Sequence, residues 1–167
     1  TLDPATLPLY YAIEYLAARW LDASVLGLRL VSAGMGLLTI PVLYALGRAL
    51  WSRGAGLVAA LCFALSPIHT FHAQGIRMYV LLTLLAALSA YTFVRVASDG
   101  TARWWALHLL VNFALLWVHP FAVLVLAVEG AFVVLRRLLQ WRFALAWIAA
   151  NALVALPLPA YFRTVSF

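Results

Sequence analysis

Residues 28–50 read LRLVSAGMGLLTIPVLYALGRAL, an almost unbroken apolar run whose charged side chains are Arg29 and Arg48. A transmembrane helix needs about 20 apolar residues, so this run is long enough to cross the hydrocarbon core of a bilayer. Runs of the same kind follow it along the chain. Six membrane spans are therefore predicted, at residues 28–50, 54–71, 77–97, 101–118, 121–139 and 141–162.

The composition also indicates a membrane protein and disfavours a soluble fold. Hydrophobic residues make up 67% of the 167 residues and charged residues 10%, and the mean hydropathy is +1.04. Soluble domains carry about 25% charged residues. We therefore predict an all-α polytopic transmembrane helix bundle, a single domain over residues 1–167. Residues 1–27 would form an outer-surface segment and residues 28–162 the six transmembrane helices.

The net charge of +6 comes from arginine, because the sequence contains no lysine. The arginines lie singly or in pairs between apolar runs, as those that flank membrane spans do, and form no stripe with interleaved aromatic residues. Membrane lipid, and not nucleic acid, is the expected partner. The lone Cys62 gives neither a disulfide framework nor a cluster of spaced metal ligands, so no metal site is predicted.

The distribution of arginine predicts which ends of the spans face the cytoplasm. The first, third and fifth turns hold Arg48, Arg53, Arg95, Arg103, Arg136, Arg137 and Arg142, with Trp51, Trp104, Trp105 and Trp141 as an interfacial aromatic belt. The opposite side holds Arg19, Arg29, Arg77 and Arg163, diluted by Asp3, Glu14 and Asp22. The odd-numbered turns are therefore predicted to be cytoplasmic, and the expected location is the inner or plasma membrane of a bacterium.

Residues 8–21, PLYYAIEYLAARWL, have a different pattern. Apolar residues recur at helical spacing, while Glu14 lies on another face and would be costly in lipid. We predict an amphipathic helix on the outer surface, with its apolar side formed by Leu9, Ile13, Leu16 and Trp20. A ragged start to a seventh span is the alternative.

Polar residues that could carry chemistry gather in residues 66–79, SPIHTFHAQGIRMY, which include His72, Gln74, Arg77 and Tyr79. Arg77 is predicted to open the next helix, where a cation gains nothing from the positive end of the helix dipole. Either an anionic ligand holds it or it extends to lipid phosphates. The two readings stay open at this point.

His119 lies between two short predicted spans, so its turn is expected slightly below the outer surface, at the floor of a cavity. There it would donate a hydrogen bond to a phosphate or sugar, or else serve as a capping or buried histidine. His108 and Asn112, four residues apart, are expected to bond between helices. Glu129 should face the interior of the bundle.

Several segments in order resemble the GT-C glycosyltransferases of the protein-mannosyltransferase and aminoarabinose-transferase type, family 39 and its bacterial relatives. The matching pieces are Leu7-Pro8-Leu9-Tyr10-Tyr11, Leu28-Arg29-Leu30-Val31-Ser32, Leu65-Ser66-Pro67 and Ala73-Gln74-Gly75-Ile76-Arg77-Met78-Tyr79. They are similar to that family's H-P-P-L-Y-Y, A-x-R-L-P-S, L-S-P and S-Q-E-A-R-M-Y. His119 is similar to its T-H or H-P-F position.

The resemblance implies transfer of a sugar from a polyprenyl phosphate to an acceptor on the outer side of the membrane, with or without a divalent metal ion in the complete enzyme. Arg77 would stabilise the departing phosphate. Gln74, Tyr79, His72 and His119 would lie in the substrate site, and Tyr10 and Tyr11 along the entrance for the lipid phosphate.

Two departures favour an alternative. The acidic base of the family is expected upstream of Thr1, and Gly75 stands where the family has glutamate. The alternative is therefore a non-catalytic transmembrane subunit that retains a glycosyltransferase-like fold and packs with other membrane subunits of a larger complex.

The predicted orientation can be tested by cysteine labelling of the full-length protein in a Cys62→Ala background. His72→Cys should react with a membrane-impermeant thiol reagent added to intact cells, whereas Arg103→Cys should react only after permeabilisation. Labelling of position 103, but not of position 72, in intact cells would reverse the orientation.

Overall fold

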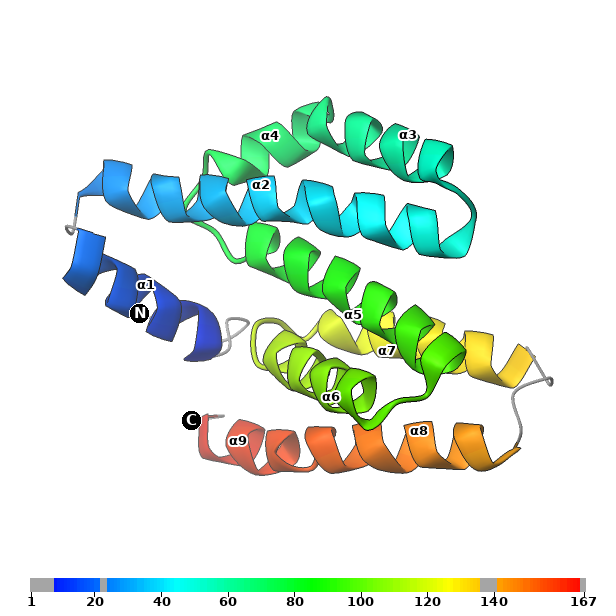
Figure 1. The fold of residues 1–167 in the computed structure, drawn as a ribbon. Helices are drawn as coiled ribbons and strands as arrows, with labels where there is room; N and C mark the ends of the chain where they lie inside the picture. Colours follow the sequence, from blue (N-terminus) through cyan, green and yellow to red (C-terminus); the bar gives the residue numbers. More distant parts are fainter. Residues whose placement is uncertain (1–7, 22–23, 136–140, 166–167) are drawn as a thin grey trace.

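The computed structural model describes residues 8–21, 24–135 and 141–165, and in these ranges all regular elements are helices. The predicted all-α helix bundle is thus confirmed (Figure 1). The helices are α1 (Pro8–Leu21), α2 (Val25–Leu50), α3 (Arg53–Ala64), α4 (Pro67–Ala73), α5 (Tyr79–Asp99), α6 (Ala102–Leu116), α7 (Ala122–Leu135), α8 (Trp141–Ala155) and α9 (Pro157–Val165).

Each predicted span coincides with one apolar helix or with two consecutive helices. Helices α2 and α5 and the stretch Trp141–Tyr161 are long and apolar enough to cross a membrane. Helices α3 and α4 meet the same test together, but they are bent by 61° at their junction. Helix α6 is shorter, with 15 residues, and the described part of α7 has 14. The predicted apolar runs thus coincide with helices, whose lengths are less uniform than predicted, and the crossing of the membrane as six spans stays a prediction.

The bend between α3 and α4 corrects the prediction of one continuous helix over residues 54–71. The hydroxyl oxygen of Ser66 accepts a hydrogen bond from the backbone N–H of His69 at 3.3 Å, as a helix-capping residue does. Pro67 occupies the first position of α4. Proline fits there because that position needs no N–H donor, but it cannot continue the preceding helix. A serine–proline pair therefore starts a new helix inside the apolar run.

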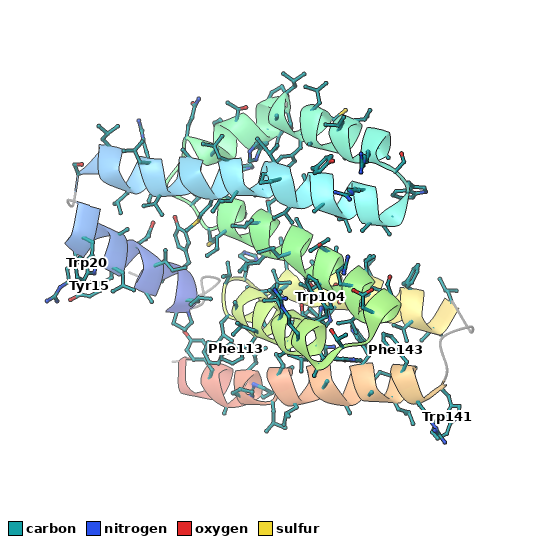
Figure 2. The ribbon with its side chains drawn as sticks, viewed as in Figure 1. Tyr15, Trp20, Trp104, Phe113, Trp141 and Phe143 are labelled. Atoms are coloured by element: carbon teal, nitrogen blue, oxygen red, sulfur yellow. The ribbon has the colours of Figure 1, made fainter. Side chains whose placement is uncertain are left out.

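Helix α1 forms where an amphipathic helix was predicted, but its buried side is different. Tyr10 and Ala17 are buried, whereas Leu16 is 53% and Trp20 80% exposed. Tyr15 and Trp20 project away from the bundle (Figure 2). The apolar side was predicted to face lipid or the bundle; Leu16 and Trp20 do not contact the bundle, because α2 and the start of α5 cover the side that contains Tyr10. An orientation of both residues toward lipid remains a prediction.

Successive turns alternate between the two ends of the bundle. Figure 1 shows the α2–α3 and α5–α6 turns at one end, together with the end of α7 and the start of α8. The α4–α5 and α6–α7 connections lie at the opposite end. The first end carries the predicted cytoplasmic arginines that the structure describes; the side chains of Arg136, Arg137 and Arg163, and residues Asp3 and Asp22, lie outside the described part.

Tryptophans at this first end contact the arginines directly. The guanidinium groups of Arg95 and Arg103 lie 4.8 and 5.8 Å from the ring centroid of Trp104. Arg142 lies over Trp141, which projects outward from the start of α8 (Figure 2). Paired cations and amphipathic rings of this kind suit the boundary between lipid and water.

Helices α5 to α8 are joined by polar side chains in their interior. His108 and Asn112 are fully buried and bond to residues of α5 and α8, which confirms the prediction of interhelical hydrogen bonds. Glu129 is also buried and faces the interior, as predicted. Its carboxyl group lies 2.7 Å from the hydroxyl oxygen of Ser89 on α5.

Helices α2 and α3 approach each other closely through two glycines. A Cβ atom on Gly56 would lie 2.5 Å from the backbone oxygen of Tyr44, and one on Gly47 would lie 2.8 Å from Cα of Gly56. Neither position has room for a side chain. Of the two glycines near the start of α3, Gly56 makes the contact, whereas Gly54 meets nothing closer than a serine hydroxyl at 3.8 Å.

Gly56→Ala should therefore destabilise the protein, and Gly54→Ala should not. The added methyl group at position 56 must displace a backbone carbonyl, a strain that costs about 2 kcal/mol. At position 54 alanine removes the helix penalty of glycine and meets no neighbour. Thermal unfolding in detergent should show a lower midpoint for the first variant and an unchanged or higher one for the second. Equal midpoints would contradict the close contact.

Candidate functional site

The polar residues predicted around Arg77 lie at the end of the bundle opposite the arginine–tryptophan contacts. His72 belongs to the last turn of α4, and Tyr79 is the first residue of α5. Their rings are 5.2 Å apart between centroids. The ring of Tyr79 in turn lies 6.1 Å from that of His119, in the α6–α7 connection. Three predicted site residues from separate elements thus form one continuous set of ring contacts.

A hollow of about 310 Å³ opens beside this set. It is lined by Arg29, Phe71, His72, Gln74, Gly75 and Arg77. The lining groups that hydrogen-bond through side chains are two guanidiniums, an imidazole and an amide, and none of these residues carries a carboxylate. Guanidinium groups bind carboxylates and phosphates with charge-assisted hydrogen bonds. The arrangement is therefore suited to an anion.

Backbone structure explains why these residues face the same hollow. Helix α4 ends at Ala73, and its last turn closes with the N–H of Gln74 donating to the carbonyl of Thr70 at 3.2 Å. The N–H of Gly75 then donates to the carbonyl of His72 at 3.1 Å. Arg77 follows in this turn, two residues before α5, and does not open the helix as predicted. The turn folds Arg77 back toward His72.

Gly75 is not required by the backbone of this turn. The glycine with a positive φ angle among the described residues is Gly100. A Cβ atom on Gly75 would lie 3.5 Å from its nearest neighbour, the carbonyl of His72, which is an ordinary van der Waals contact. The structure would thus accommodate a side chain at the position where the resembling family has glutamate.

His119 is held by its own backbone. It is 6% exposed, and its Nδ1 atom accepts a hydrogen bond from the backbone N–H of Phe121 at 3.1 Å. This arrangement is the capping and buried role that the sequence left open. Nδ1 is therefore occupied. His119 and Tyr79 are in ring contact, but neither of these two predicted site residues lines the hollow.

Tyr10 and Tyr11 are not part of the lining of the hollow. Tyr10 is buried against Met78, Leu81 and Val118, and its ring lies 6.2 Å from that of Tyr11. Burial, followed by the hydrogen bond and charge of Glu14, raises the pKa of the Tyr10 phenol above its usual value. Tyr10 therefore stays uncharged and acts here as a core residue that fixes α1 against α5.

Arg29 is the residue that the sequence-based site did not include. It lies in the second turn of α2 and reaches the hollow from the side opposite α4. A signal was present, because Arg29 occupies the arginine position of the A-x-R-L-P-S segment in the resemblance above. Among the described residues no group of three or more His, Cys, Asp or Glu side chains is placed to hold a metal ion.

Comparisons with known proteins agree with this picture. The profile of the dolichyl-phosphate-mannose-protein mannosyltransferase family matches residues 5–161. A dolichyl-diphosphooligosaccharide–protein glycosyltransferase subunit STT3B of Oryza sativa subsp. japonica is 36% identical over 73 residues, which are 40% of this chain and 9% of that protein. The chain thus spans a small part of that relative. No solved structure matches. By the extent of the family match, this chain belongs to the dolichyl-phosphate-mannose-protein mannosyltransferase family, among the GT-C membrane glycosyltransferases.

Proposed function

We propose that this chain is part of a glycosyltransferase that moves a sugar from a polyprenyl phosphate to an acceptor on the outer side of a bacterial cell membrane. The observation that carries the proposal is the hollow lined by both Arg29 and Arg77. Arg29 of α2 and Arg77 of the α4–α5 connection both line it, and none of the lining residues carries a carboxylate to neutralise them. Family membership supports the same class of reaction.

The proposed chemistry is displacement at the anomeric carbon of the sugar. As the bond from this carbon to the phosphate oxygen breaks, negative charge grows on the departing lipid phosphate. A fixed guanidinium stabilises that charge more in the transition state than in the bound donor. Arg77 and Arg29 would each supply donors, and a planar fork can bind two phosphate oxygens at once.

The surroundings of the hollow favour a phosphate that is attached to a lipid. Phe71 lines the hollow and is 75% exposed, and the neighbouring Ile68 is 72% exposed. Large apolar side chains next to an anion site would be unfavourable in water, but they suit an isoprenoid chain. The phosphate would bind the arginines while the chain lies along the exposed side of α4. In this placement residues 1–27 lie on the outer surface and residues 28–162 form the membrane part.

The second candidate is a non-catalytic subunit that keeps this fold and packs with other membrane subunits. Gly75 favours it, since the turn has room for the glutamate that the family carries there. Such a subunit would bind lipid phosphate without transferring the sugar. An activity assay therefore separates the two candidates.

Arg77→Ala should lower turnover by roughly a hundredfold or more, the usual scale for losing one group that stabilises transition-state charge. The full-length protein is assayed for sugar transfer from a polyprenyl-phosphate donor, with protein amount and thermal midpoint measured in parallel. Arg77→Lys should recover only part of the turnover, because an ammonium cannot make the two-pronged contact.

Arg53→Ala is the matched control, since it removes an exposed arginine at the opposite end of the bundle. Its turnover should equal that of the wild type. If Arg77→Ala kept wild-type turnover, the hollow would have no role in sugar transfer. A wild-type protein that binds the donor but transfers no sugar would support the subunit.

A further inference from the structure

A cluster of polar side chains lies between helices α5 to α8, away from the hollow that Arg29 and Arg77 line. The hydrogen atoms available for its hydrogen bonds can be assigned one by one. No member is more than 5% exposed, so the partners must come from the cluster and the adjacent backbone. Several of these groups can only donate or only accept, which fixes the roles of the others. The members are Ser89, Thr92, His108, Asn112, Glu129, Trp147 and Asn151.

The orientation of the two asparagines follows from a backbone carbonyl. The Nδ2 atom of Asn151 donates to the carbonyl of Trp147 at 2.9 Å, so its Oδ1 atom faces the bundle. This Oδ1 accepts from Nδ2 of Asn112 at 2.7 Å. The Oδ1 atom of Asn112 must then be the one directed at Ser89, 2.5 Å from the serine oxygen. It is an acceptor and needs a hydrogen from that hydroxyl.

The imidazole of His108 is neutral by the same reasoning. The indole N–H of Trp147, which can only donate, lies 3.2 Å from Nε2, and Nδ2 of Asn112 lies 3.1 Å from the same atom. Nε2 therefore accepts and carries no proton. The proton is on Nδ1, which lies 3.1 Å from the hydroxyl oxygen of Thr92. The hydroxyl hydrogen of Thr92 goes to the carbonyl of Leu88 at 2.8 Å.

Ser89 then has one hydrogen for two oxygen contacts. Its hydroxyl oxygen lies 2.5 Å from Oδ1 of Asn112 and 2.7 Å from Oε1 of Glu129. The hydrogen is needed for Asn112, so the contact with Glu129 requires a hydrogen from the carboxyl group. An ionised carboxylate has none and would place two lone-pair oxygens against each other.

The surroundings offer no charge that would favour the ionised form. His108, whose Nε2 atom lies 3.6 Å from Oε2 of Glu129, is neutral. Arg95, further along α5, pairs with Asp99 and lies over Trp104. Trp147 and Asn151 are the groups that α8 contributes to the cluster. A second cavity, of about 680 Å³, is lined by Glu129 together with residues at the end of α2 and just after it. These residues carry no charge: Leu46, Ala49, Leu50 and Trp51.

We propose that Glu129 is a neutral carboxylic acid in the folded protein, and that its proton is a structural hydrogen bond, donated to Ser89, which holds α7 against α5. Assembly of the bundle then depends on a bound proton. The second cavity, which lies between α2, α5 and α7 and is lined by Glu129, gives that proton a path to the surroundings. Removing it leaves a buried, unpaired charge, which is far costlier in this interior than in water.

Two substitutions of Glu129 distinguish a neutral carboxylic acid from an ionised carboxylate at this position. Glu129→Gln keeps a donor toward Ser89, so the thermal midpoint of the full-length protein in detergent should stay within about 1 °C of wild type. Glu129→Met keeps the size and removes the donor, and should lower the midpoint by roughly 3 °C or more. Raising the pH should lower the midpoint of the wild type more than that of the Gln variant, because only the wild type must keep this proton to stay folded.

Infrared spectroscopy reports the proton directly and needs no sugar transfer. A carboxylic acid has a C=O stretching band that a carboxylate lacks, so the difference between wild type and Glu129→Gln at neutral pH should contain this band. Ser89→Ala should shift its frequency, because the acid loses its acceptor. A Gln variant as unstable as Met, or a difference spectrum with a carboxylate band instead, would overturn the proposal.

Discussion

A polar atom inside a membrane protein must find its partner within the protein, because lipid offers none, and this constraint acts most strongly on helix α5. Ser89 and Thr92 of this helix bond to α6 and α7, while α6 bonds in turn to α8. Apolar contacts alone would not fix the rotation of these helices, since lipid is as apolar as leucine. Each hydrogen bond of the cluster restricts the rotation of one helix about its axis. The four helices α5 to α8 therefore keep fixed orientations relative to one another.

The same fixed orientations position the hollow at the far end of the bundle. Helix α5 begins with Tyr79, whose ring touches both His72 and His119. Helix α6, held through His108 and Asn112, ends just before the connection that carries His119. On the other side, the contact of Gly47 with Gly56 fixes α3 against α2. The bend after α3 then carries α4, and with it His72, toward Arg29.

The sequence predicted the fold to the extent that hydropathy controls it. Apolar runs located the helices from α2 onward, two of these runs each containing two helices, and the polar spacing of His108 and Asn112 predicted bonding between helices. The break at Ser66 was missed because a capping serine and a first-turn proline act through local backbone geometry, which an average over the run conceals. The sequence did not decide whether Trp20 of α1 faces lipid or the bundle, since both accept an apolar residue. Arg29 was left out of the site because α2 and α4 meet only in the folded chain.

The unequal lengths of the helices have a consequence for the surrounding lipid. Helix α2 has 26 residues and rises about 39 Å, whereas α6, with 15, rises only about 22 Å. The hydrocarbon core of a bilayer is about 30 Å thick. The molecule therefore presents two hydrophobic thicknesses to one membrane. A bilayer that matches α2 must thin beside α6, or another apolar surface must cover this short helix.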